Sequence, residues 1–141
     1  MAVLSADKTR TVAGTPIGFR AGVAASTTIF QGALLALDAG GSLIPAANTA
    51  SLAFAGVAQD YVDNSAGADD VLKCNVQRGH AEWFAQTGLV QAQLGKNVFV
   101  TDDQTVTDAA VGTNELKVGT LLELSGATAL VYIGVYAVLD A

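Results

Sequence analysis

The sequence predicts an all-β protein, a small β-barrel or sandwich-like domain built from bent β-ribbons with an extended N-terminal arm. About nine short apolar runs recur at regular spacing, separated by turns rich in Gly, Asp, Asn and Ser. Hydrophobic residues make up 51% of the chain but aromatic residues only 6%, so small and β-branched side chains must fill the interior, as in closely packed sheets. The 141 residues suit one domain, and the single Cys74 allows no internal disulfide.

We divide the chain into an extended N-terminal arm, residues 1–22, and a single β domain, residues 23–141. Glycine and proline punctuate the arm, which carries no apolar face that would commit it to a core. Predicted strands then follow at residues 27–30, 33–37, 42–44, 52–62, 71–85, 98–100, 105–107, 118–124 and 129–138. Residues 88–95 have the spacing of a single helical turn.

Two stretches of the chain repeat the same order of parts. Residues 32–44 and residues 95–106 each contain a glycine, a short apolar run, an aspartate that opens a turn, and a second strand. Asp38 and Asp102 are the two turn-opening aspartates, because an aspartate side chain can accept hydrogen bonds from the backbone just beyond it. We expect a weak internal duplication of a β-ribbon.

The strand that begins at residue 71 predicts an exposed surface. Leu72, Cys74 and Val76 share one face, which a straight strand would continue as Arg78, His80 and Glu82. A bulge at Gly79 would shift the register and keep the core face apolar, as Ala81, Trp83 and Ala85. His80, Glu82 and Phe84 would then face outward and form a self-association surface. The alternative is that the loop at residues 46–51 covers Phe84.

Charge is distributed unevenly along the chain. The net charge is −6, but Lys8, Arg10 and Arg20 against Asp7 give residues 1–20 a charge of +2, which leaves −8 on the rest. An acidic body argues against nucleic-acid binding, since phosphate contacts need clustered Lys and Arg. No apolar run is long enough to span a membrane, and no secretory signal is visible. The three basic residues are either partner contacts or a solvated tail.

No catalytic, cofactor or metal site emerges from the residue pattern. His80 and Glu82, two positions apart on one strand, form an ordinary surface pair, and Cys74 lies on an apolar face that disfavours its thiolate. The aspartates cluster without the spacing of a calcium loop, and we interpret them as turn formers. With one His and one Cys, the chain lacks the Cys and His ligands of a typical zinc site. We expect a non-enzymatic protein without cofactors.

Several segments together resemble the capsid cement (decoration) proteins of tailed bacteriophages. The resemblance extends over nearly the whole chain and rests on the order and spacing of its segments: residues 4–8, 21–23, 29–38, 55–64, 78–79, 94–106 and 118–120. It implies a non-catalytic β protein, usually trimeric, that sits on the outer surface of the phage head and cements neighbouring capsomers. The protein would be made in the host bacterial cytoplasm and then be part of the virion.

The resemblance implies two partners, the major capsid protein and further copies of this chain. We expect Lys8, Arg10 and Arg20 to contact the capsid, and His80, Glu82 and Phe84 to mediate self-association. An alternative is a β-sandwich binding module that recognises surface carbohydrate. Such sites present exposed aromatic platforms, whereas the only tryptophan, Trp83, is predicted to be buried. A third class, a small hydrolase, lacks a recognisable nucleophile and base.

Overall fold

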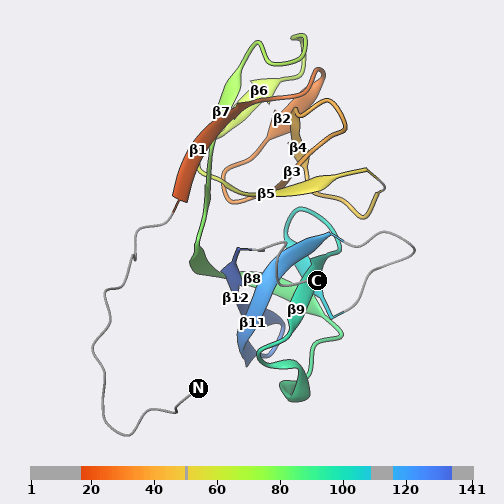
Figure 1. Cartoon of the computed structure of the whole chain (residues 1–141), viewed down its shortest axis with the longest axis vertical. Helices are drawn as coiled ribbons and strands as arrows, with labels where there is room; N and C mark the ends of the chain where they lie inside the picture. Colours follow the sequence, from red (N-terminus) through yellow and green to blue (C-terminus); the bar gives the residue numbers. More distant parts are fainter. Residues whose placement is uncertain (1–16, 50, 109–115, 135–141) are drawn as a thin grey trace, which may run out of the picture.

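A computed structural model describes residues 17–49, 51–108 and 116–134 and confirms the all-β fold (Figure 1). The described chain forms twelve strands and one short 3-10 helix, η1 (Gln91–Gln93), where the sequence predicted a helical turn. The strands are β1 (Ile17–Gly22), β2 (Thr27–Ile29), β3 (Leu34–Leu37), β4 (Leu43–Pro45), β5 (Ala53–Ala58), β6 (Val62–Asn64), β7 (Lys73–Arg78), β8 (His80–Thr87), β9 (Asn97–Val100), β10 (Thr105–Thr107), β11 (Lys117–Ser125) and β12 (Thr128–Ile133).

The strands form two main groups that are stacked along the long axis of the molecule (Figure 1). One group is a five-stranded sheet with the order β1-β7-β5-β3-β4, accompanied by the two-stranded sheet β2-β6. The other is a closed barrel in which β8, β12, β11, β9 and β10 follow one another and β10 returns to β8. The chain passes from the first group to the second between β7 and β8, at Gly79.

Both predicted hairpins are present, and an aspartate shapes each turn. The Asp38 Oδ1 atom accepts hydrogen bonds from the backbone N–H groups of Gly40 and Ser42, each at 2.9 Å. The Asp102 Oδ1 atom accepts one bond, from the N–H of Gln104, also at 2.9 Å. These bonds stabilise the bend because they satisfy backbone donors that the strands leave unpaired.

The internal duplication extends well beyond the two hairpins. Leu35 of β3 stands opposite Gly56 of β5, and Val98 of β9 stands opposite Gly119 of β11. Both residues of the second pair lie 63 positions after their counterparts in the first (98 − 35 and 119 − 56). A register shift accompanies each pair, next to the glycine. The two halves therefore share the bulge as well as the strand order.

The two halves also share their mode of closure. In the second half, β10 runs parallel to β8 and pairs Val106 with Gln86. In the first half, 63 positions earlier, a single parallel bridge joins Leu43 of β4 to Val23, just after β1. The first sheet therefore curls until its edges touch at one bridge, whereas the second closes over three residue pairs.

The two turn aspartates, Asp38 and Asp102, do not occupy equivalent positions in the repeat. The N–H of Asp38 bonds to the carbonyl of Ser42, and 63 positions later the N–H of Thr101 bonds to the carbonyl of Thr105. Thr101 is therefore the backbone counterpart of Asp38, and Asp102 lies one residue further on. The predicted equivalence of Asp38 and Asp102 is off by one position, although both side chains stabilise their turns.

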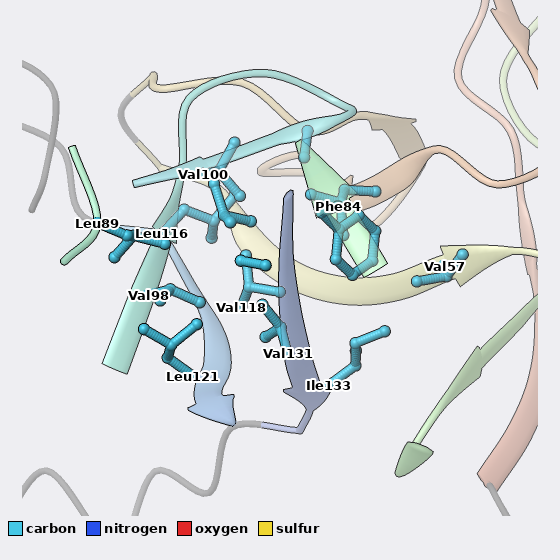
Figure 2. Packing of buried hydrophobic residues seen from close by; sticks show 14 of the residues in the cluster. Val57, Phe84, Leu89, Val98, Val100, Leu116, Val118, Leu121, Val131 and Ile133 are labelled. Carbon is cyan, nitrogen blue, oxygen red and sulfur yellow. The ribbon is translucent and has the colours of Figure 1, made fainter. Parts of the chain in front are cut away.

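Buried side chains form two clusters, and one of them joins the halves. The first half encloses a cluster of mainly small and branched residues that includes Ile29, Leu35 and Cys74. The barrel cluster takes in Leu34 and Val57 from the first half as well as the barrel's own interior side chains, shown in Figure 2. The two halves thus share apolar contacts in a single packed unit.

The predicted orientation of β8 is wrong. Phe84 is only 6% exposed and lies in the barrel cluster, on the side that faces Val57 (Figure 2), whereas Trp83 is 48% exposed. Gly79 has a left-handed backbone (φ 87°), but it connects two sheets instead of forming a bulge within one strand. The inner face of β8 therefore remains His80, Glu82 and Phe84, because the barrel core lies on that side.

The predicted boundary of the arm also differs from the structure. Ile17 to Gly22 form β1, which pairs along its whole length with β7. The Arg78 guanidinium lies 5.9 Å from the centre of the Phe19 ring, a cation–π contact between these two strands. The first sheet therefore begins at residue 17, and the rest of the predicted arm, residues 1–16, lies outside the described residues.

Candidate interaction surfaces

Aspartates around the first sheet act as structural hydrogen-bond acceptors. The Asp63 carboxylate accepts bonds from Ser65 and Thr28, which lower its pKa below the ordinary value. The Asp60 carboxylate accepts two bonds from Asn75. Asp70 accepts the hydroxyl of Ser42 at 2.9 Å. These bonds connect loops to neighbouring strands. They account for the presence of the three carboxylates without a bound ligand.

Asn64 stabilises the region where the two edges of the first sheet meet. Its buried amide nitrogen donates to the carbonyl groups of Val23, Ala24 and Ala68 at 2.9 to 3.1 Å. Val23 is also the residue that bridges to Leu43. A buried amide with several satisfied bonds stabilises this junction, because breaking it would leave backbone acceptors unpaired.

His80 and Glu82 contact one another at the junction of the two halves. The His80 Nε2 atom lies 2.5 Å from a carboxylate oxygen of Glu82, and both side chains are partly buried. They line a hollow of about 240 Å³ together with Gln31, Gln59 and Gln77 from the first half. The pair therefore faces the junction of the halves instead of the outer surface that the sequence predicted for it.

Cys74 lies on the inner face of β7, as the sequence predicted. Its side chain is fully buried, and burial raises the pKa of the thiol. Among the described residues, His, Cys, Asp and Glu side chains form no group of three or more that could hold a metal ion. No helix in the same part of the chain has the length and hydropathy to span a membrane.

An apolar surface covers the outside of the barrel around Trp83. Trp83 of β8 stands opposite Leu130 of β12, and Ala81 opposite Tyr132. Leu122, beside the register shift of β11, is a second large exposed apolar residue in these strands. We call this surface the Trp83 face: Ala81, Trp83, Ala85, Leu122, Leu130 and Tyr132, bordered by the exposed Glu123 opposite Leu130. Exposed apolar residues gathered on one sheet face are typical of an interface.

The corresponding strand of the first half carries a cation in the position of Trp83. Arg20 of β1 stands opposite Asn75 of β7, and Trp83 lies 63 positions after Arg20 (83 − 20) on the equivalent strand. Both side chains point outward and are exposed. The other two predicted capsid-contact residues, Lys8 and Arg10, lie outside the described residues.

A second surface feature is a polar seam between the two halves. A hollow of about 350 Å³ is lined by residues 30–33, before β3, and by Asp103 and Gln104 from the turn between β9 and β10. The N–H of Leu34 donates to the carbonyl oxygen of Asp103 at 2.7 Å and fixes the two segments together. Gln31 and Gly32 also line the hollow that contains His80 and Glu82, so the two hollows adjoin.

An exposed aromatic pair stands beside this seam. Phe30 and Tyr61 are 62% and 58% exposed, and their ring centres lie 5.5 Å apart at an angle of 51°. Phe30 itself lines the larger hollow. The sequence reasoning missed this pair because the two residues are 31 positions apart and meet only through the pairing of β2 with β6.

The fold and these surfaces define an all-β protein of two related five-stranded units. Comparison of the chain with models of protein families, with curated proteins and with solved structures finds no match.

Proposed function

We propose that this chain is a non-catalytic structural protein of a phage virion, which decorates the outside of the head and cements neighbouring capsomers. The observation that carries the proposal is the pair of equivalent outward positions, Arg20 on β1 and Trp83 on β8. One repeated unit presents a cation and the other an exposed apolar face, so a single chain offers two different surfaces. A protein that cements a shell needs two such contacts.

In this proposal the copies of the chain associate through the Trp83 face. This surface replaces the predicted set of His80, Glu82 and Phe84. A buried Phe84 is unavailable to a partner, whereas exposed tryptophan and tyrosine residues are frequent centres of binding energy. The low content of charged residues, 14% of the chain, leaves few groups that would be costly to desolvate in an interface. The assembly that we propose is a trimer.

Arg20, together with the basic residues Lys8 and Arg10, contacts the major capsid protein in this proposal. Arg20 is exposed on an edge strand of the first sheet, where a shell protein can reach it. A guanidinium recognises a carboxylate through two parallel hydrogen bonds, so an acidic surface on the shell is the expected partner. Many weak contacts of this kind hold firmly when many copies bind one shell.

Binding to phage heads that lack this protein tests the proposal. Purified protein should co-sediment with such heads and appear as regularly spaced density on their outer surface by cryo-electron microscopy. Arg20→Glu should weaken binding, whereas Lys96→Glu, which reverses an exposed charge on the second half, should not. Absence of wild-type protein from the heads would refute the decoration function.

The oligomeric state tests the role of the Trp83 face separately. In sedimentation equilibrium the wild type should behave as a trimer and Trp83→Ser as a monomer. Val90→Ser removes another exposed apolar side chain, 56% exposed, and should leave the trimer intact. A monomeric wild type, or a Trp83→Ser variant that remains trimeric, would contradict the assigned interface.

Carbohydrate recognition is the second candidate function, and one observation favours it. From the sequence, a carbohydrate site is disfavoured because no exposed aromatic platform is expected. Phe30 and Tyr61 form such a platform, an exposed aromatic pair beside a polar hollow and separate from the Trp83 face. This function is compatible with decoration, since the two use different surfaces.

A further inference from the structure

We propose that the seam between the two halves, next to Phe30 and Tyr61, is a binding site for a neutral saccharide. Ligand sites favour concave regions where two structural units meet, and this seam is such a region. The larger hollow, of about 350 Å³, falls within the usual size range of ligand pockets, and the adjoining hollow adds about 240 Å³.

The lining of the seam has the hydrogen-bonding chemistry that sugar hydroxyl groups require. Side-chain amides come from Gln31 and Gln104 in the larger hollow and from Gln59 and Gln77 in the smaller one. An amide both donates and accepts hydrogen bonds, as a hydroxyl group does. The Asp103 carboxylate, which also lines the larger hollow, adds a strong acceptor.

The aromatic pair supplies the apolar part of the site. Sugar rings carry C–H faces that pack on aromatic rings, while their hydroxyl groups turn toward polar neighbours. Phe30 borders the larger hollow, and Tyr61 extends the aromatic surface outward and carries a hydroxyl group of its own. Large aromatic side chains left exposed at the edge of a polar hollow are explained by such a ligand better than by the fold.

Charge decides which saccharides fit. None of the described residues that line either hollow is Lys or Arg, whereas Asp103 and Glu82 bring carboxylates. Uronic acids, sialic acids and phosphorylated sugars would therefore be repelled. A basic peptide is disfavoured because amides outnumber the carboxylates, and Glu82 is already engaged by His80. A neutral polyhydroxylated ligand satisfies both kinds of group.

A glycan array followed by titration calorimetry of the purified full chain tests the proposal. Neutral oligosaccharides of hexoses and N-acetylhexosamines should bind, and sialylated, uronic and phosphorylated glycans should not. Phe30→Ala and Asp103→Asn should each weaken binding of the best neutral oligosaccharide by about tenfold or more, as expected for the loss of one stacking or charge-assisted contact. Val71→Ala, which changes an exposed apolar residue away from the seam, should bind like the wild type.

Three results would overturn the site: no binding of any neutral glycan, binding that none of the seam variants changes, or preferential binding of an oligolysine peptide. Thermal unfolding of each variant shows whether a loss of binding reflects a loss of the fold. Arg20 and the Trp83 face are not among the residues that line the two seam hollows, and neither Phe30 nor Asp103 belongs to the proposed capsid or self-association contacts. Failure of the saccharide site would therefore leave the decoration function in place.

Discussion

Gly56 and Gly119 occupy the same position in the two halves of the molecule. Each stands opposite the second residue of the first strand of a hairpin, beside a register shift. At each glycine the neighbouring strand approaches so closely that a side chain has no room. A Cβ atom at residue 56 would lie 2.7 Å from the carbonyl oxygen of Gln77, and one at residue 119 would collide with that of Tyr132.

Gly119→Ala should therefore destabilise the barrel strongly. The added methyl group meets backbone atoms of β12, which cannot move aside without breaking the pairing of β11 with β12, so we expect a loss of about 2 kcal/mol or more. Urea unfolding measures the change. Gly18→Ala, where the nearest atom would be 3.8 Å away, is the matched control and should be nearly neutral. Equal stability of the two variants would show that the close approach at Gly119 is unimportant.

Phe84→Ala should be among the most destabilising substitutions in the chain. Its ring fills the barrel core, and removal of a buried phenylalanine side chain costs about 3 to 5 kcal/mol. Trp83→Ala, one residue earlier, should change the stability of the monomer by less than about 1 kcal/mol. Denaturant unfolding of both variants at low protein concentration measures the difference. The opposite order would restore the orientation of β8 that the sequence predicted.

Asp38→Ala should cost more stability than Asp102→Ala. Asp38 accepts two backbone hydrogen bonds in its turn and Asp102 accepts one, so we expect losses of about 1 to 2 kcal/mol and about 0.5 to 1 kcal/mol. Asp102→Asn keeps the accepting oxygen and should lose less than Asp102→Ala. Thermal unfolding of the three variants provides the comparison. A larger loss for Asp102→Ala would point to a role beyond its turn.

Asp103→Asn should stabilise the protein at neutral pH. Burial, and in second place the charge of Asp102, raise the pKa of Asp103, so ionisation disfavours the folded state. The folded carboxyl holds its proton more tightly than the unfolded one. The gain from Asp103→Asn should therefore be absent below the unfolded pKa of about 3.9, grow as the pH rises through the folded pKa, and then stay constant.

Melting temperatures at about pH 3 and pH 7 measure this dependence. Glu123→Gln, which removes another carboxylate from the acidic body at an exposed position, is the control for a general change in net charge. A gain that is the same for both variants, or the same at both pH values, would contradict the assigned cause. If Asp103→Asn is more stable and also binds saccharide less well, Asp103 is retained at a cost to stability, as is common at binding sites.

Local signals explain why much of the fold could be predicted. The turn at Asp38 depends on a side chain bonding to its own backbone, and the turn of residues 125–127 depends on Gly126, which has a φ of 59°. Such interactions lie within a few residues and leave a direct trace in the sequence. The burial of Cys74 and Val76 followed from simple alternation in the same way.

The orientation of β8 could not be predicted, because it depends on where another part of the chain lies. Alternation shows that Trp83 and Phe84 face opposite ways but not which of them faces inward. The sequence predicts His80 and Glu82 on the outer face, because a charged pair is costly to bury in a core. In the structure these two side chains contact each other in the seam, at the end of the barrel, where the first half shields them only partly.

The sequence by itself determined an all-β fold, the two hairpins with their turn aspartates, and a repeat of their order, because each depends on neighbours along the chain. Only the tertiary structure decided that the repeat spans five strands with equal registers, from the pairing of Leu35 with Gly56 to that of Val98 with Gly119. It also decided that Trp83 faces outward, and that Phe30, Asp103 and Gln104 meet in one seam. Strand pairing between distant residues brings these groups together, and no local pattern encodes it.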